Sequence, residues 1–150
     1  MWNDIQGAFW RAGPIAPGLH LEGVLPRLRE EAVAFLEDHH RERRDRPFFL
    51  YLALPAPHTP WLPLPEFRGV SGAGMYGDFT AQVDDLFGEV TSTLERLGYA
   101  RNTLVIFSTN FHPNEIFDKA ALRRIFFKIK VDGPSQENFL KIFAMVARKK

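Results

Sequence analysis

The chain has 150 residues, of which 45% are hydrophobic and 25% are charged, and its formal net charge at pH 7 is +1. These values are typical of an ordinary soluble globular protein with room for one domain. The absence of cysteine excludes a disulfide framework, a thiolate metal site and a cysteine nucleophile.

The sequence has no pattern of a membrane span or of a secretion signal. A membrane-spanning helix needs about 18 consecutive apolar residues, and no segment reaches that length. The N-terminus lacks the basic and then apolar layout of a signal peptide. By default, we expect a cytoplasmic protein.

The first predicted element is a helix over residues 25–41, after an irregular arm over residues 1–24 that is rich in Gly and Pro. Pro26 suits the first turn of a helix. Apolar residues recur at helical spacing at Leu25, Leu28, Ala32, Phe35 and Leu36.

Two histidines, His39 and His40, stand near the end of this helix, and Arg41, Arg43 and Arg44 follow them. Adjacent helical positions do not converge on one metal ion. We therefore expect both histidines to be solvated in a cationic helix terminus.

The apolar run over residues 48–54 predicts a strand that is buried on both faces. Pro55, Pro57 and Pro60 cannot continue a hydrogen-bonded ladder, so the chain leaves the sheet there. His58 then lies just past the carboxyl end of the strand, where open α/β sheets bind ligands. It is a candidate general acid or anion-binding group. The alternative is a loop histidine that bonds a nearby carbonyl.

A long loop over residues 55–77 precedes a helix over 78–97 and a second buried strand over 103–109. The loop holds five prolines and four glycines, and the prolines favour a stiff, extended path. Asp78 can cap the helix and Gly98 can end it. Together the two strands and the helix predict a parallel βαβ unit with a right-handed crossover.

Asn110 directly follows the second predicted strand. Because parallel strands end at the same edge of a sheet, Asn110 and His58 can line one crevice. The alternative for Asn110 is a turn residue. Asp84 and Asp85 are more typical of a helix surface than of a carboxylate site. We find no Gly-rich phosphate loop, nucleophile elbow or His/Asp cluster at metal spacing.

Beyond residue 110 the charge changes sign. Residues 1–110 hold ten Lys or Arg and fourteen Asp or Glu (−4), whereas residues 111–150 hold nine and four (+5). This split predicts two segments of different character. The second segment is expected to form two basic helices, over 117–130 and 135–149.

Several motifs resemble, in order, the sulfatase family, the type-I arylsulfatases. The motif of residues 46–61 contains the His58-Thr-Pro-Trp61 turn. Further similar segments are residues 10–14, 25–27, 31–35, 67–71, 76–79, 83–84 and 102–107. The resemblance covers roughly residues 1–110. It implies part of an alkaline-phosphatase-like α/β/α sandwich that contains the βαβ unit, followed by an unrelated helical tail over 111–150.

The family hydrolyses sulfate esters, and the resemblance implies that His58 contacts the sulfate group and assists departure of the leaving alcohol. The family nucleophile, a formylglycine, is made in a Cys/Ser-x-Pro-x-Arg motif, which this chain lacks. The family's N-terminal pair of calcium-binding aspartates is also absent. Where the family has the Asp and Asn of Ser-Asp-Asn-Gly, further calcium ligands, this chain has Asn110 and Phe111.

Phe111 has no oxygen that could bind Ca²⁺, so Asn110 is left as a weak candidate metal ligand. We therefore expect a sulfatase-like protein that is inactive alone and that does not bind the calcium of its relatives. The alternative is a non-catalytic interaction module whose basic tail binds an acidic partner. Nucleic acid is not the partner we expect. A metal-dependent phosphoesterase of the same superfamily would need the same missing ligands. Unpaired sheet edges also predict self-association.

Overall fold

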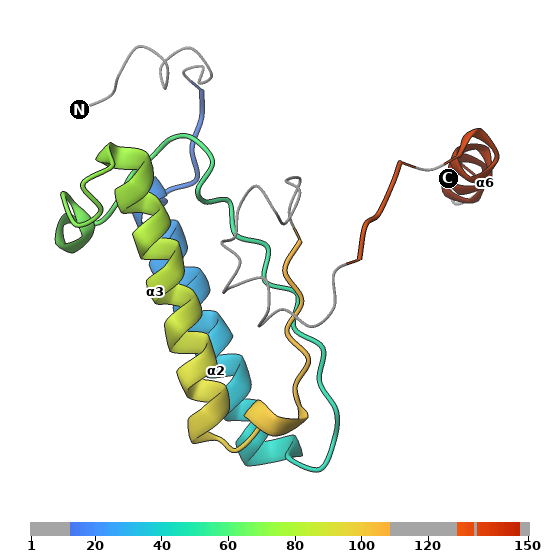
Figure 1. Cartoon of the computed structure of the whole chain (residues 1–150), viewed down its shortest axis with the longest axis horizontal. Helices are drawn as coiled ribbons and strands as arrows, with labels where there is room; N and C mark the ends of the chain where they lie inside the picture. The colour runs from blue at the N-terminus through green and yellow to red at the C-terminus, as the bar shows by residue number, and fades with distance from the viewer. Residues whose placement is uncertain (1–12, 109–128, 134, 148–150) are drawn as a thin grey trace. The chain divides into compact units, whose positions relative to one another are not determined.

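The computed structural model describes residues 13–108, 129–133 and 135–147 (Figure 1). Its helices are α2 (Val24–Arg43), α3 (Gly74–Arg96) and α6 (Gln136–Ala147), with short 3-10 turns η1 (Leu21–Gly23), η2 (Pro65–Phe67) and η3 (Ala100–Asn102). The chain divides into two compact units, Met1–Leu104 and Val105–Lys150. The predicted boundary at residue 110 lies outside the described residues and stays a prediction. None of the described helices combines the length and hydropathy that crossing a bilayer requires.

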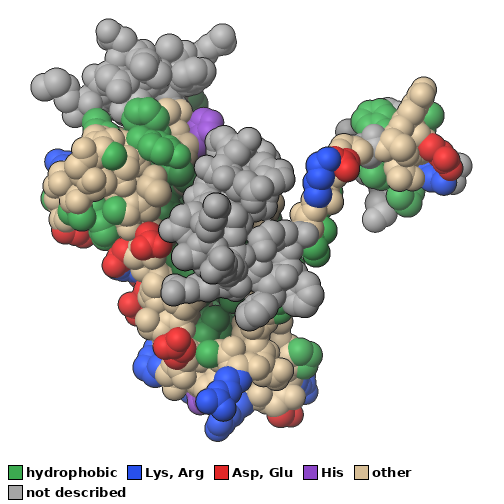
Figure 2. Space-filling model, viewed as in Figure 1, with side chains coloured by type: hydrophobic (Ala, Val, Ile, Leu, Met, Phe, Trp, Pro, Cys, Tyr) green, Lys and Arg blue, Asp and Glu red, His purple; other side chains and the backbone are tan. Residues whose placement is uncertain are grey.

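Helices α2 and α3 lie side by side and run parallel (Figure 1). Ion pairs join Arg29 to Asp85, at 3.5 Å, and Glu37 to Arg96, at 2.7 Å, so the residue numbers rise together along both helices. Acidic and basic side chains are interspersed on the face shown in Figure 2. The apolar faces form the core, which contains Leu25, Ala32, Leu36, Ala56, Phe79, Leu86, Val90 and Leu94. Both predicted helices of this unit are confirmed, and α3 begins four residues before the predicted start.

Helix α3 ends just before Gly98, the residue that was predicted to end it. Gly98 adopts a left-handed conformation, with φ at 77°. Its N–H donates to the carbonyl of Glu95 at 3.0 Å, and the Tyr99 N–H donates to the carbonyl of Leu94 at 2.8 Å. These two bonds define a Schellman motif, which satisfies carbonyls that the helix leaves unpaired.

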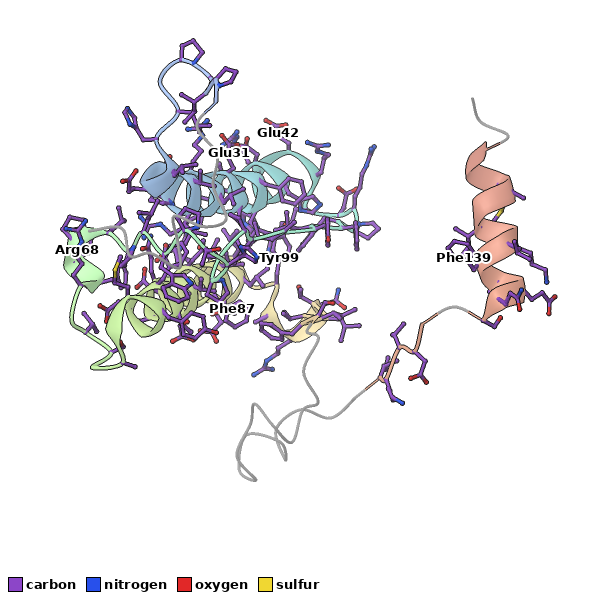
Figure 3. All side chains as sticks on the ribbon, turned by 90° about the horizontal axis from the view of Figure 1, so that it is seen from above. Glu31, Glu42, Arg68, Phe87, Tyr99 and Phe139 are labelled. Carbon is purple, nitrogen blue, oxygen red and sulfur yellow. The ribbon has the colours of Figure 1, made fainter. Side chains whose placement is uncertain are left out.

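The end of α2 differs from the prediction because His39 is buried, with 5% of its surface exposed. Its Nδ1 lies 3.0 Å from the Tyr99 hydroxyl, and its ring packs against those of Phe35, Phe48 and Tyr99 (Tyr99 is labelled in Figure 3). The expectation of a solvated His39 was wrong. Position 39 follows Leu36 by three residues, so it lies on the same apolar stripe of the helix.

Residues 48–54 are extended, but only one face of this segment is covered. Phe48, Leu50, Leu52 and Leu54 pack against the helical core. In contrast, Phe49 is 87% exposed and Tyr51 is 80% exposed. The prediction of burial on both faces was therefore wrong, because an apolar run does not reveal what covers its second face.

The segment after α3 is also extended and exposed. Leu104 is 78% exposed and Ile106 is 79% exposed, so the predicted burial of this second strand was wrong as well. A strand is assigned only where a partner completes the hydrogen-bonded ladder, and no strand occurs in the described ranges. The parallel βαβ unit thus stays a prediction.

Helix α6 confirms the second predicted tail helix within the described residues. The Ser135 hydroxyl accepts a hydrogen bond from the Asn138 N–H at 3.2 Å, which caps the start of the helix. Lys141 pairs with Glu137 at 2.6 Å. The predicted helix over 117–130 lies almost entirely outside the described residues.

Candidate functional site

The turn that carries His58 is fixed to the core just before the histidine. Ala56 is one of the buried core residues. The backbone N–H of His58 donates to the carbonyl of Pro55 at 3.2 Å, which closes the turn. The Ala56–Pro57 and Thr59–Pro60 peptide bonds are both cis. As predicted from the prolines, the chain turns sharply where the extended segment ends.

The His58 side chain is exposed, and its two ring nitrogens differ. Nδ1 lies 2.9 Å from the Thr59 carbonyl oxygen, to which a protonated Nδ1 can donate, and 3.3 Å from the Thr59 hydroxyl oxygen. No residue in the described part of the chain hydrogen-bonds Nε2. The histidine therefore makes the carbonyl contact of the alternative interpretation and still presents Nε2 to an external ligand.

Trp61 links this turn to α3. Its indole Nε1–H donates to the carbonyl of Pro57 at 3.1 Å. Its ring meets that of Tyr76, in the first turn of α3, edge to face with centroids 5.5 Å apart. Aromatic pairs of this geometry add about 0.5–1.5 kcal/mol beyond the area they bury. The turn is thereby held against the N-terminal part of α3.

Asp78 folds the preceding loop onto the same part of α3. Asp78 is buried, with 5% of its surface exposed. It accepts hydrogen bonds from the Gly69 N–H at 2.7 Å, the Ser71 N–H at 3.0 Å and the Ser71 hydroxyl at 2.7 Å. The Gly69 N–H and then the Ser71 donors lower the pKa of Asp78, although burial opposes them. The expectation that Asp78 caps the helix was wrong, because α3 begins at Gly74 with Ala73 as its N-cap residue.

Gln82 makes a second polar contact between the loop and α3, which the periodicity of the sequence did not predict. It is 4% exposed, and its side-chain oxygen accepts a hydrogen bond from the Leu64 N–H at 3.0 Å. A glutamine within the apolar stripe of the predicted helix was the available signal. A polar side chain on a buried face needs a partner, and a loop backbone is the nearest source.

The other sequence candidates do not join His58 in the described structure. Asn110 lies outside the described residues, so its crevice with His58 stays a prediction. Asp84 and Asp85 are exposed on α3, as expected for a helix surface. Within the described ranges, no group of three or more His, Asp or Glu side chains could hold a metal ion. Neither the concavity lined by Leu25, Leu64 and Leu86 nor the one lined by Ala34 and Glu89 includes His58.

Comparisons with known proteins identify relatives of most of this unit. Residues 25–110 match the family model described as Sulfatase. The mouse N-acetylgalactosamine-6-sulfatase is 34% identical over 107 residues, which are 71% of this chain and 20% of that protein. The rat steryl-sulfatase is 42% identical over 89 residues, which are 59% of this chain and 15% of that protein. An N-acetylgalactosamine-6-O-sulfatase of Bacteroides thetaiotaomicron is 33% identical over 111 residues, 74% of this chain and 21% of that protein. The chain spans about a fifth of the length of such relatives, and no solved structure matches it.

Gly77 tests the packing of the loop on α3. A Cβ added at Gly77 would lie 2.5 Å from the Ser71 Oγ and 2.7 Å from the Ala73 Cβ. We predict that Gly77→Ala destabilises the protein by roughly 1–3 kcal/mol, because the loop must shift. A Cβ added at Gly88, in the same helix, would have no neighbouring atom within 4 Å. The control Gly88→Ala should therefore stabilise the protein by about 0.5–1 kcal/mol. Thermal melts of both variants measure the difference, and equal stabilisation by the two would contradict this packing.

Asp78 should make stability depend on pH. Because its folded-state pKa is lowered from the usual 3.8, its carboxylate stabilises the fold above that value. This stabilisation is lost as the pH falls through the folded-state pKa. We predict that Asp78→Asn lowers the melting temperature at neutral pH and flattens the loss of stability in acid. The control Asp84→Asn, which removes an exposed carboxylate of the same helix, should keep the wild-type profile. Parallel profiles for wild type and Asp78→Asn would refute the assignment.

Proposed function

Because the chain belongs to the sulfatase family, we propose that it carries the leaving-group side of a sulfate-ester hydrolase site and does not complete that site alone. Membership implies an alkaline-phosphatase-like α/β fold and descent from enzymes that hydrolyse sulfuric esters. The observation that supports the proposal is the geometry of His58, an exposed residue whose Nδ1 contacts the Thr59 carbonyl while no described residue hydrogen-bonds its Nε2.

His58 has the chemistry that departure of an alcohol requires. When the bond between sulfur and the ester oxygen breaks, that oxygen gains negative charge. A protonated imidazole can donate its Nε2 proton to this oxygen, so that a neutral alcohol leaves. The bond from Nδ1 to Thr59 fixes the ring orientation that this transfer needs. Trp61 supports that orientation by holding the turn on α3 through Tyr76.

The remaining parts of a sulfatase reaction are not supplied by this sequence. The chain has no cysteine and no Ser-x-Pro-x-Arg segment, so it lacks the precursor of the nucleophile that attacks sulfur. The sulfatase family is generally metal-dependent. The described residues do not fit a metal ion, and Phe111 provides no ligand oxygen. We therefore propose that the chain holds no calcium, and we derive no step through a metal.

The proposed substrate class is the sulfate ester of an alcohol. The relatives are named for different substrates, a sulfated amino sugar in one group and a steryl sulfate in the other. The two groups share the ester itself, which is the part that His58 would contact. The alternative function, an interaction module with a basic tail, stays a prediction. In α6, the described part of that tail, the charges of Lys141 and Glu137 pair with each other and add no net positive charge.

We predict that the purified chain does not hydrolyse 4-nitrophenyl sulfate, with or without added CaCl₂. A general acid assists a reaction but cannot replace the missing nucleophile. Release of 4-nitrophenol, followed by absorbance, measures this. The His58→Ala variant should give the same background rate. Turnover by the wild type that disappears in His58→Ala would overturn the proposal of an incomplete site.

Binding of the ester tests the role of His58 separately. Addition of 4-nitrophenyl sulfate at constant ionic strength should shift the NMR signal of the His58 Cε1–H group in a saturable way, because Nε2 meets the anion. His20, an exposed histidine outside this turn, is the internal control and should not shift. The spectrum of His58→Gln assigns the signal. Parallel, non-saturating shifts of both histidines would show a general salt effect and count against the proposal.

A further inference from the structure

The end of α2 carries a run of exposed arginines that the proposed function does not use. Arg41 and Arg43 lie in the last turn of the helix, where basic side chains are favourable. Arg44 and Arg46 follow in the turn that leads to the extended segment (Figure 1), and all four residues are exposed. Connections between a helix and the next strand run over the surface of α/β folds, so the fold of the family keeps this turn accessible.

The spacing of three of these arginines suits one kind of binding groove. In an extended chain the side chains alternate, so Arg41 and Arg43 share one side and Arg44 points to the other. Each guanidinium can pair with a carboxylate through two hydrogen bonds. A protein that binds this stretch as a strand therefore needs acidic pockets on both sides of the backbone, just before the Arg44–Asp45 bond. Endoproteases that cut after paired basic residues have such pockets and bind their substrates as extended strands.

The last turn of α2 can become extended at little cost. Arg44, the residue that ends the helix, has a φ of −53°, so α2 lacks the left-handed residue that closes α3. The Arg46 N–H donates to the carbonyl of Arg43 at 2.9 Å. Arg41 pairs with Asp38 at 2.6 Å, but the two side chains are 65% and 54% exposed, and ion pairs this exposed contribute little. Local unwinding of this turn therefore breaks few stabilising contacts.

Buried residues on both sides of the arginines confine the unwinding. Before them, His39 is buried and lies 3.0 Å from the Tyr99 hydroxyl. After them, the Phe48 ring packs against the rings of His39, with centroids 5.0 Å apart, and Tyr99, at 5.6 Å. A cut between His39 and Phe48 leaves this cluster intact. The apolar core and the ion pairs between α2 and α3 also remain.

We propose that the Arg44–Asp45 bond is a processing site, cut by an endoprotease with acidic pockets for Arg41, Arg43 and Arg44. In this step water adds across the peptide bond. Its oxygen bonds to the carbonyl carbon of Arg44, the bond from that carbon to the Asp45 nitrogen breaks, and the nitrogen takes up a proton. The products are a carboxylate at Arg44 and a free amino group at Asp45. Because the contacts on both sides persist, the two products stay together as one folded unit.

A convertase of the subtilisin-like class, which requires arginine at the first and fourth positions before the cut, is the probe. Incubated with the native chain, it should release residues 1–44 and 45–150, which mass spectrometry identifies. Arg41→Gln should slow this cut at least about tenfold, because it removes an arginine that pairs with an acidic pocket. The control Arg101→Gln, at an exposed arginine in η3, should be cut like the wild type.

Trypsin separates accessibility from recognition, because it requires only the arginine that precedes the cut. It should cut the wild type and Arg41→Gln after Arg43 or Arg44 at equal rates. After the convertase cut, the two fragments should elute together from a sizing column and separate in guanidinium chloride. An intact Arg44–Asp45 bond in the native chain, equal convertase rates for the wild type and Arg41→Gln, a trypsin rate that falls as much as the convertase rate, or fragments that separate without denaturant would each overturn the proposal.

Discussion

The contact between the inward side chains of residues 48–54 and the pair of helices α2 and α3 determines the main features of the described structure. Phe48, Leu50, Leu52 and Leu54 join the helical core. The segment is therefore held extended along the helices, and the proline turn with His58 follows directly at its end. The same alternation directs Phe49 and Tyr51 outward. One packing contact thus accounts for both the position of the candidate site and the exposed apolar face.

The loop between the His58 turn and α3 is held to the helix by polar side chains as well as by apolar ones. A buried carboxylate is costly unless it is hydrogen-bonded, and Asp78 has three donors from the loop before the helix. Gln82 bonds Leu64 in the same way. These bonds join the loop to α3, and the Trp61–Tyr76 contact joins the His58 turn to the same helix.

Much of this arrangement could be predicted from the sequence where the signal is local. The spacing of apolar residues predicted α2 and α3, Gly98 marked the end of α3, and the prolines marked the turn at His58. The errors concern contacts between distant segments. His39 was expected in solvent because Tyr99, its partner, is 60 residues away. The roles of Asp78 and Gln82 depend on a loop whose path periodicity does not describe.

The burial of residues 48–54 shows a different limit. The absence of polar residues from this run indicates that both faces can be covered, but it does not say by which molecule. Membership in a family with an α/β fold implies neighbouring strands and a covered second face. This chain spans about a fifth of the length of its relatives, and its described residues leave one face and the backbone edge open. The apolar pattern of residues 48–54 therefore predicts that both faces can be covered, whereas only the contacts of the described residues show that the side chains from Phe48 to Leu54 pack on the helical core.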